Sequence, residues 1–415
     1  MITLAIWLGQ DFVGQLSHDA PSNRFAFAYS PQWLRDPRRF PLSPQLPLAP
    51  PADQTPEQHG AVVRQFFENL LPEGDALDHA AQAAGTSKAN LTGLLIALGK
   101  ETAGAVRVTL TGENQEEPDS QPPSLRLITP AELSQRIYMS QETPFSVWDG
   151  RVRLSIAGYQ DKIAVYEKDG RWYLVDGPQL ASTFIVKPLP AREGMRTLPE
   201  NEYMCMQLAA RVGLNVAPTR LVHVPQPVLF VRRFDRAEQN GAVARLHVID
   251  GCQALGLSVA MKYERNYGDG ADVANIREGA SLQKLFAFVR AHSPSPALDV
   301  RALLRWTLFQ VLVGNTDAHG KNISFFSGLE GQRLAPAYDI VCIPALPAKL
   351  SLSYAMAIGD AFSSQALTPY EWAHFAHLCH LPFPLVATEM KALAQRILDV
   401  IDQVATDVQT AGVSA

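Results

Sequence analysis

The sequence predicts an α+β fold of two lobes, with a mixed α/β N-terminal lobe and an all-helical C-terminal lobe. Strand-like segments with alternating apolar residues predominate at first between residues 150 and 260, and helix-like segments predominate from residue 281 onward. The chain has 415 residues, 47% of them hydrophobic, which allows a large core divided among two or three domains. An acidic, proline-rich stretch, ENQEEPDSQPPS at 113–124, marks the best candidate boundary.

We divide the chain at these changes in composition. The predicted segments are an N-terminal subdomain (1–112), a linker and connecting segment (113–147), a strand-rich core (148–260) and a helical lobe (261–415). In the N-terminal subdomain, the stretches TLAIWL, FVGQLS and RFAFAY are typical of short strands. HGAVVRQFFENLLPEG is an amphipathic helix, for which we expect Pro72 and Gly74 to be the stop, and LTGLLIALG is a second helix.

The strand-rich core opens with a hairpin, KIAVYEKDGRWYLV, whose Lys-Asp-Gly sequence marks the turn. STFIVKP is a further strand and ends at Pro188. The helix NEYMCMQLAARVGL follows, and then the strand-like stretches TRLVHV and PVLFVRRFD. Further on, a helix with one apolar face ends at Gly314-Asn315. Its apolar face comprises Val300, Leu303, Leu304, Leu308, Val311 and Leu312.

Charge and cysteine content exclude several classes of protein. The net charge of −5 argues against a chain that binds nucleic acid without a partner. The four cysteines are far apart and form no CxxC pair, so we expect reduced thiols in a cytoplasmic protein. The N-terminus lacks the basic start of a signal peptide, and no apolar run reaches the length of a membrane span.

The stretch GNTDAHGKNISFF, at 314–326, concentrates polar chemistry between two apolar segments. If the following strands form a hairpin in which Phe326 faces Arg333, Asp339 returns beside Asn322. An amide and a carboxylate there suit Mg²⁺ that is also bound by phosphates, and Asp317 can accept or orient a substrate hydroxyl. The spacing D-x-x-x-x-N equals that of a kinase catalytic loop. The spacing is also common in ordinary polar turns with Asx-type hydrogen bonds, which remain the alternative.

Other parts of a phosphotransferase occur in the expected order. Ile156, Ala157 and Gly158 form a small-residue turn that can approach phosphates, or else a plain entry into a strand. Lys187 projects from a strand toward a cleft, or else reaches solvent. Glu202, near the start of the next helix, can pair with Lys187 or merely favour the helix dipole. The order of these parts is that of a two-lobed protein kinase, although the usual G-x-G-x-x-G, H-R-D, D-F-G and A-P-E strings are missing.

The chain resembles the HipA family, the serine/threonine-kinase toxins of bacterial toxin–antitoxin pairs. The resemblance covers about residues 1–400. It is carried by PLSPQLPL, FFENLLPEG, ALGKETAGAV, RLSIAGYQDK, FIVKP, ENEYMCMQLAARVGLNV, VRRFDR, DGCQALGL, MKYE, GNTDAHGKN and LAPAYDI. It implies the two-lobed protein-kinase-like fold of HipA proteins.

The resemblance also implies roles for individual residues. Asp317 is the expected catalytic aspartate, Asn322 and Asp339 are the expected Mg²⁺ ligands, and Lys187 is expected to hold the ATP phosphates. The expected autophosphorylation site is Ser155. The remaining expected nucleotide-site residues are Ile156, Ala157, Gly158, Phe234, Asp235, Gln253 and His319. Two departures from the best-known member are Arg232 in place of a glutamate and Tyr159 in place of a smaller residue.

By this resemblance we expect an ATP-dependent protein serine/threonine kinase that uses Mg²⁺. As a toxin it would be neutralised by a HipB-like helix-turn-helix antitoxin, reach operator DNA only through that antitoxin, and phosphorylate an aminoacyl-tRNA synthetase. Two alternatives stay open: a catalytically weak, nucleotide-binding scaffold that acts as co-repressor with the antitoxin, and a small-molecule kinase on the same fold.

Overall fold

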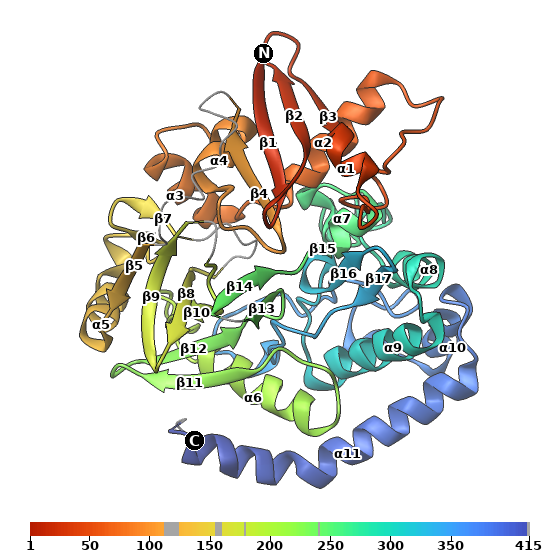
Figure 1. The fold of residues 1–415 in the computed structure, drawn as a ribbon. Helices are drawn as coiled ribbons and strands as arrows, with labels where there is room; N and C mark the ends of the chain where they lie inside the picture. Colours follow the sequence, from red (N-terminus) through yellow and green to blue (C-terminus); the bar gives the residue numbers. More distant parts are fainter. Residues whose placement is uncertain (112–123, 154–159, 178–179, 240, 413–415) are drawn as a thin grey trace.

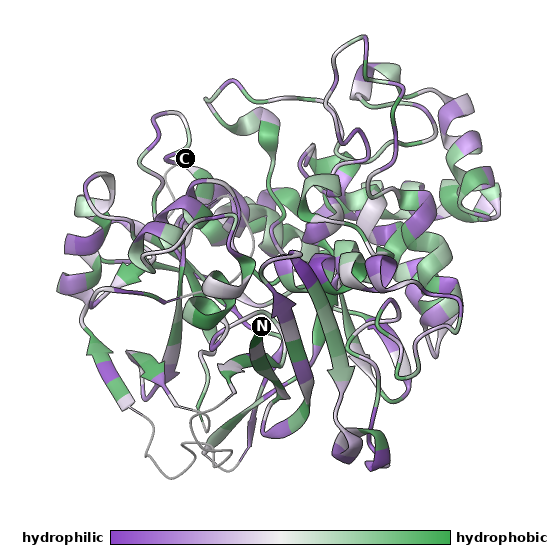
Figure 2. Ribbon diagram, turned by 90° about the horizontal axis from the view of Figure 1, so that it is seen from above, coloured by the Kyte–Doolittle hydropathy of each residue, from purple (hydrophilic) through white to green (hydrophobic). Residues whose placement is uncertain are grey.

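The structure, a computed structural model, describes residues 1–111, 124–153, 160–177, 180–239 and 241–412 (Figure 1). An N-terminal domain lies at the top of the view, a strand-rich lobe at the left, and a helix-rich lobe at the lower right. Both hydrophobic and hydrophilic residues occur on most helices, as expected for helices that bury one face (Figure 2). Within the described residues, no helix combines the length and apolarity needed to cross a membrane.

The N-terminal domain is built on an antiparallel sheet in the order β3-β2-β1-β4. Its strands are β1 (Ile2–Leu8), β2 (Asp11–Asp19), β3 (Arg24–Tyr29) and β4 (Val106–Leu110). Its helices are α1 (Pro31–Arg35), α2 (Pro56–Glu68), α3 (Gly74–Ala83) and α4 (Leu91–Leu98). The predicted strands and helices are present. Helix α2 ends at Glu68, before the expected stop at Pro72, and Gly74 begins α3 instead of following a helix.

The strand-rich lobe contains a six-stranded sheet in the order β11-β12-β10-β8-β9-β5. Its elements are β5 (Ser124–Ile128), α5 (Pro130–Tyr138), β6 (Val147–Trp148), β7 (Arg151–Val152), β8 (Ile163–Lys168), β9 (Arg171–Asp176), β10 (Phe184–Lys187), α6 (Leu198–Arg211), β11 (Thr219–His223), β12 (Pro227–Arg232), β13 (Arg236–Gln239) and β14 (Ala242–Arg245), with a 3-10 turn at Met139–Gln141. The predicted β8–β9 hairpin turns at Asp169 and Gly170, both at positive φ, which matches the twist of the strands.

The segment expected to connect two domains is structured where the structure describes it. Strand β5 pairs with β9 along its length, so it is an edge of the six-stranded sheet. The sequence signal was weak because Leu125 and Leu127 are exposed on this edge strand. In α5, Leu133 and Ile137 are buried against the sheet and give the helix its apolar face.

The C-terminal lobe is not all-helical, which corrects the sequence prediction. It holds the sheet β15-β16-β17, in which β16 pairs antiparallel with both neighbours. Phe326 faces Arg333 in this register, as predicted. The strands are β15 (Val248–Asp250), β16 (Ser324–Gly328) and β17 (Gly331–Leu334), and the helices are α7 (Gly251–Leu255), α8 (Leu282–His292), α9 (Pro296–Val313), α10 (Pro369–Leu378) and α11 (Phe383–Thr410). Short 3-10 turns lie at Val259–Met261, Gly320–Asn322, Ile343–Ala345 and Ser364–Ala366.

Helix α11 runs along the base of the molecule and packs against α6 and α9, which belong to different lobes (Figure 1). Its buried Glu389 accepts from Arg301 at 2.6 Å, and Arg211 of α6 pairs with Asp407 at 2.7 Å. On α9, Leu303, Leu304 and Leu308 are fully buried as predicted. Leu312, predicted on the same face, is 41% exposed.

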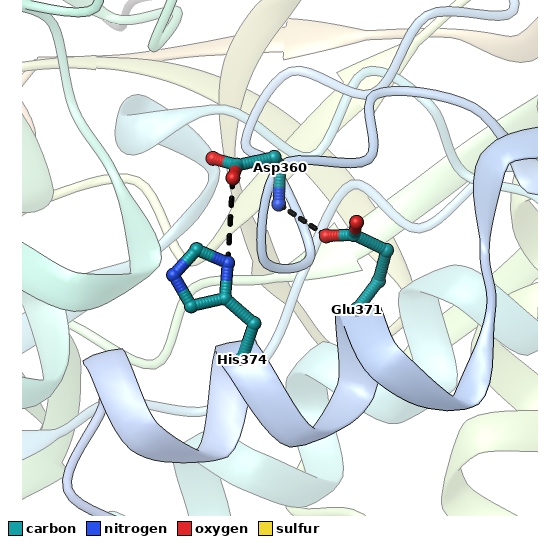
Figure 3. A group of neighbouring side chains, drawn as sticks. All are labelled: Asp360, Glu371 and His374. Atoms are coloured by element: carbon teal, nitrogen blue, oxygen red, sulfur yellow. Dashed lines mark hydrogen bonds and ion pairs between the residues drawn. The ribbon is translucent and has the colours of Figure 1, made fainter.

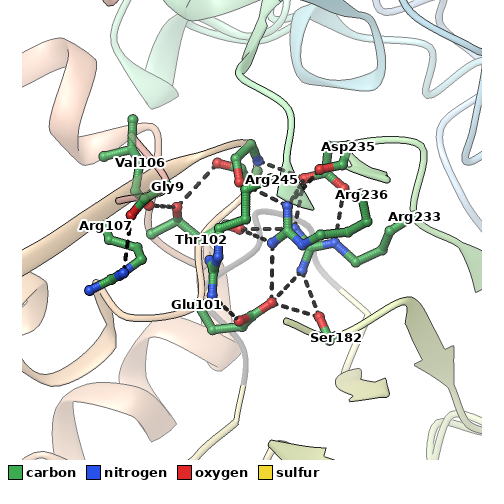
Figure 4. A network of polar contacts seen from close by, with 12 residues as sticks. Gly9, Glu101, Thr102, Val106, Arg107, Ser182, Arg233, Asp235, Arg236 and Arg245 are labelled. Carbon is green, nitrogen blue, oxygen red and sulfur yellow. Dashed lines mark hydrogen bonds and ion pairs between the residues drawn. The ribbon is translucent and has the colours of Figure 1, made fainter. Parts of the chain in front are cut away.

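A buried polar network joins the N-terminal domain to the strand-rich lobe (Figure 4). Glu101 accepts from Arg233 at 2.9 Å, Arg236 at 3.1 Å and Arg245 at 2.7 Å. Asp235 binds Arg233 and Arg236 from the other side. Burial alone would raise the pKa of Glu101, but the three arginines lower it from 4.5 to about 2. The two carboxylates thus hold three buried guanidinium groups at the domain interface.

Glu101→Gln tests the strength of this interface. The change leaves three buried arginines with one carboxylate, so we expect a loss of about 3–5 kcal/mol in the free energy of unfolding at pH 7. Because the folded-state pKa of Glu101 is depressed, its contribution is present above pH 4.5 and disappears as the pH falls toward about 2. Denaturant unfolding at several pH values measures both effects.

The matched control is Glu238→Gln. Glu238 pairs with Arg232 at 3.0 Å, but both side chains are about half exposed, so the expected change is below about 1 kcal/mol. Equal effects of the two substitutions would contradict the role of Glu101.

Candidate active site

Helix α9, which leads into the polar motif, ends at Gly314, a glycine in the left-handed backbone conformation. Gly314 has φ of 74°, and its N–H bonds to the carbonyls of Gln310 and Val311. The Asn315 N–H bonds to the Gln310 carbonyl at 2.8 Å, which completes the cap. A Cβ atom on Gly314 would lie 3.1 Å from Pro344 Cδ. The chain therefore leaves α9 in one direction, toward residues 315–322, which we call the catalytic loop.

The catalytic loop is braced by its own hydrogen bonds. Asp317 N–H donates to Asn315 Oδ1 at 3.2 Å, and His319 N–H donates to the Asp317 carbonyl at 2.8 Å. Asn322 Nδ2 donates to the same carbonyl at 3.0 Å. The first of these is an Asx-type bond, so the ordinary description of the motif as a polar turn is correct at the level of the backbone. The last of these bonds also fixes the direction of the Asn322 side chain.

Lys187 is the centre of the ion pairs beside this loop. Its Nζ lies 2.7 Å from Glu202 Oε1 of α6 and 2.6 Å from Asp339 Oδ1, which follows β17. The predicted pairing of Lys187 with Glu202 is present, and Lys187 is buried instead of reaching solvent. Burial raises the pKa of Glu202 to about 7, whereas Lys187 and Lys162 hold the pKa of Asp339 well below its usual range.

Asp339 is held next to the catalytic loop. Asn315 Nδ2 donates to its carbonyl at 3.4 Å, and its charge acts on both Asp317 and His319. Asp339 adopts a left-handed backbone with φ of 58°, which is uncommon outside glycine and often found at functional sites. The hairpin therefore returns Asp339 to the catalytic loop, where its hydrogen bond is to Asn315. The predicted place of Asp339 beside Asn322 stays a prediction.

Lys162 belongs to this cluster, and the sequence analysis did not single it out. It is buried at the start of the β8–β9 hairpin and interacts electrostatically with Lys187, Asp339 and Glu202. Burial and the neighbouring Lys187 lower its pKa to about 8. The signal available in the sequence was its place directly after the expected phosphate turn.

Asp317 is exposed at the edge of the cluster and receives a hydrogen bond from Tyr263. The Tyr263 hydroxyl donates to Asp317 Oδ1 at 2.7 Å. Desolvation by the surrounding protein raises the pKa of Asp317, and the Tyr263 bond opposes this shift. The Tyr263 ring meets the His319 ring edge-on at 5.1 Å. Tyr263 was not predicted as a site residue.

His319 and Lys321 are buried within the catalytic loop. His319 Nδ1 accepts from the Lys321 backbone N–H at 3.2 Å, so a neutral ring carries its proton on Nε2. Burial, with the nearby Lys262 charge, lowers the pKa of His319 well below its ordinary value. Burial alone would also lower the pKa of Lys321, but Asp250 raises it, so Lys321 stays charged.

The remaining predicted residues lie outside this cluster or outside the described residues. Phe234 packs against Tyr338 and Phe326 with ring centroids 5.7 and 5.8 Å apart, so it borders the hairpin that carries Asp339. The Asp235 carboxylate forms ion pairs with Arg233 and Arg236 of the domain interface. Gln253 forms a capping box with Asp250 and donates to the Phe66 carbonyl, so its side chain has a structural role here. Ser155, Ile156, Ala157 and Gly158 fall outside the described residues.

Asn322 and Asp339 fit the chemistry of a Mg²⁺ site. Asn322 Nδ2 donates to the Asp317 carbonyl, so the side-chain amide oxygen of Asn322 remains as the atom that could bind a metal. Asp339 supplies a carboxylate, whose pKa is lowered by Lys187 and Lys162. Hard oxygen ligands of this kind, completed by phosphates and water, are those that Mg²⁺ prefers.

A second group of potential metal ligands has a different explanation. The ligand atoms of Asp360, Glu371 and His374 lie within 4.8 Å of one another (Figure 3). Glu371 accepts from the Asp360 N–H at 2.6 Å, and Asp360 pairs with His374 at 3.4 Å and with Arg277 at 2.5 Å. The guanidinium supplies the positive charge that a metal would bring, so these contacts fasten the loop at Asp360 to α10.

Comparison with known proteins finds matches to two protein-family models that together cover most of the chain. The model of the HipA N-terminal domain matches residues 4–109, and that of the HipA-like C-terminal domain matches residues 154–411. The chain belongs to the HipA family. The "Serine/threonine-protein kinase toxin HipA" of Shewanella oneidensis is 38% identical over 406 residues, which cover 97% of this chain and 89% of that one. The "Putative kinase Y4mE" of Sinorhizobium fredii is 35% identical, with 97% and 92% covered.

A solved HipA structure is similar over nearly the whole fold. It is the Shewanella oneidensis HipA in complex with HipB and operator DNA, with a TM-score of 0.84, 38% identity, and coverage of 97% of this chain and 91% of that one. The N-terminal domain and the two lobes of this chain are therefore all present in the fold of that HipA structure.

Gly314→Ala tests how the helix cap sets the catalytic loop. Gly170→Ala, in the β8–β9 turn, is the matched control because Gly170 has φ of 71° but open space around a new Cβ. We expect the control to lose about 1 kcal/mol of unfolding free energy from backbone strain. Gly314→Ala should lose clearly more because its Cβ meets Pro344. Equal losses in chemical denaturation would show that the contact with Pro344 does not constrain the loop.

Proposed function

We propose that this HipA-family chain is an ATP-dependent protein serine/threonine kinase that acts as the toxin of a toxin–antitoxin pair. The observation that carries the proposal is the ion-paired cluster of Lys187, Glu202 and Asp339 beside the Asp317–Asn322 loop. A lysine paired with a helix glutamate, a metal-binding aspartate and a D-x-x-x-x-N loop are the working parts of a kinase. The relatives named as kinases support the same assignment.

In the proposed mechanism, Lys187 binds the ATP phosphates and Glu202 holds Lys187 in place. Lys162, buried next to Lys187, adds a second cation on the phosphate side. Asn322 and Asp339 are the residues that would hold Mg²⁺, which would supply positive charge to the phosphates. In the structure Asp339 Oδ1 accepts a hydrogen bond from Lys187, so the same lysine that would bind the phosphates also holds the proposed metal carboxylate in place.

Asp317 serves the substrate hydroxyl. The hydroxyl oxygen attacks the γ-phosphorus, the bond from that phosphorus to the ADP oxygen breaks, and the hydroxyl proton passes to Asp317. One carboxylate oxygen of Asp317 is oriented by Tyr263, so the other is the acceptor for the proton. Desolvation by the surrounding protein raises the pKa of Asp317, which makes its carboxylate a stronger base than that of an ordinary aspartate.

Substrates and partners follow from the family. We propose that Ser155 is a site of autophosphorylation and that the protein target is an aminoacyl-tRNA synthetase, both by resemblance to HipA kinases. We further propose that the neutralising partner is a HipB-like helix-turn-helix antitoxin. The similar solved structure, in which a HipA occurs with HipB and operator DNA, supports this partner.

Two aspartate substitutions test the catalytic roles through autophosphorylation, which needs no second protein as substrate. Wild-type protein incubated with Mg-ATP should gain one phosphate at Ser155, detected by mass spectrometry. Asp317→Asn should lose this transfer by about 10²-fold or more but bind ATP nearly as before, because it acts on the hydroxyl. Asp339→Asn should lose both transfer and Mg²⁺-dependent ATP binding. Asp53→Asn, at an exposed loop position, is the control.

Undiminished phosphorylation by either site variant would refute the assigned roles. Wild-type protein that binds Mg-ATP but never transfers phosphate to Ser155 or to a synthetase would favour a nucleotide-binding scaffold over a kinase.

Binding to DNA tests the proposed partner. Because the chain carries a net charge of −5, we expect no tight binding to operator DNA by the purified chain at about 150 mM salt. Addition of the antitoxin should produce a complex containing all three components. Gel-shift or fluorescence-anisotropy titrations measure both states. Salt-resistant binding by the chain alone would contradict the proposal that it reaches operator DNA only through the antitoxin.

A further inference from the structure

The turn that follows helix α2 of the N-terminal domain, residues 69–73, lies against the catalytic loop. Two lysines, one buried and one partly buried, join them. Lys321 belongs to the catalytic loop itself, and Lys262 lies on the segment before Tyr263. Both lysines end on side chains or carbonyls of the 69–73 turn. This connection spans about 190 to 250 positions of sequence, as the separations of 189 and 252 between the bonded residues show.

Lys321 is the first link. Its Nζ donates to the Asn69 carbonyl at 3.0 Å and to Asn69 Oδ1 at 2.8 Å, and it pairs with Asp250 Oδ2 at 2.5 Å. The residue is only 5% exposed. A buried ammonium group needs all of its hydrogen bonds satisfied, and its three partners here have fixed positions. The backbone next to Asn322 is therefore tied to the N-terminal domain.

Lys262 is the second link. Its Nζ lies 2.6 Å from Glu73 Oε2, and its own carbonyl accepts the Gly320 N–H of the catalytic loop at 2.9 Å. The next residue, Tyr263, donates its hydroxyl to Asp317. Glu73 thus holds Lys262, whose carbonyl binds Gly320 and whose neighbour Tyr263 binds Asp317.

Glu73 has a feature that packing alone does not explain. Its side chain is 7% exposed, and among the described residues its Oε1 atom is buried without a hydrogen-bond partner. Leaving a buried carboxylate oxygen unpaired is unfavourable, and a neutral residue at this position would avoid it. The other carboxylate oxygen, Oε2, holds Lys262 beside the catalytic loop.

We propose that Asn69 and Glu73 are positioning residues of the active site, so that the N-terminal domain forms part of the catalytic centre. Asn69 fixes the Lys321–Asn322 end of the catalytic loop. Glu73 fixes the Asp317 end through Lys262 and Tyr263. This inference deepens the proposed kinase function and, in its kinetic part, rests on it.

Glu73→Gln in the full chain is the first test. Glutamine keeps the shape but removes the charge that holds Lys262. We expect kcat for autophosphorylation to fall by about tenfold to a hundredfold, as for a small misplacement of reacting groups, while the KM for ATP stays within about twofold. The control is Glu68→Gln, five residues earlier at the end of α2, which removes the partly exposed pair of Glu68 with Arg64 and should leave kcat unchanged.

A double-mutant cycle separates the contact from general damage. Lys262→Met should lower kcat to a similar extent, and the double variant Glu73→Gln/Lys262→Met should be no worse than the poorer single variant. Additive losses would overturn the coupling between these two side chains.

Hydrogen exchange tests the positioning without relying on activity. Glu73→Gln and Asn69→Ala should speed amide exchange in residues 317–323, where Gly320 N–H bonds to the Lys262 carbonyl, and leave exchange in α11 unchanged. If exchange rises throughout the core, or does not rise in the loop, the positioning role is wrong. If the loop responds as expected but the wild-type protein transfers no phosphate, the proposed kinase function fails while the positioning role stands.

Discussion

The structure depends on the requirement that every buried cation meet fixed acceptors. Lys187 satisfies it with Glu202 from α6 and Asp339 from the segment after β17, so a single ammonium group joins the two lobes at the site. The domain interface meets the same requirement with Glu101 and Asp235, which hold three arginines. Such pairs contribute little net stability but strongly penalise any arrangement that separates the partners. They therefore specify how the domains sit on one another more than how stable each domain is.

Local patterns in the sequence predicted those parts of the fold that are determined locally. The Asp169-Gly170 turn, the end of α9 at Gly314 and the facing of Phe326 with Arg333 were all visible in short stretches. They were predictable because turn chemistry and strand alternation act over a few residues. The prediction of an all-helical C-terminal lobe was wrong because the β16–β17 hairpin, itself indicated by the sequence, belongs to this lobe. The third strand, β15, was not predictable because it is only three residues long and lies far from β16 in sequence.

The candidate site was predictable where its residues lie on one motif or on an element next to it. Lys187 meets Asp339, and Asn322 bonds within the Asp317 loop, since a helix cap, a hairpin and a strand place them. Their shared role in metal and nucleotide binding stays a prediction. Asn69, Glu73 and Tyr263 were missed because their contacts cross domains or join distant loops, and no spacing in the sequence encodes such contacts. Lys162 was missed although its place after the expected phosphate turn was a signal. Gln253, predicted from a matching string, has its side chain engaged in a helix cap, and its role at a nucleotide site stays a prediction.

The long helix α11 has a consequence for the protein while it is being synthesised. Lys187, Glu202 and the catalytic loop all precede Asp339, and α11, which braces α6 and α9, comes last. Domains made first can fold first on the ribosome. A growing chain can thus form its N-terminal domain and its phosphate-binding lysine well before it gains the metal carboxylate and the helix that clamps both lobes. If the proposed function holds, phosphate transfer therefore has to wait until Asp339 and α11 have been synthesised.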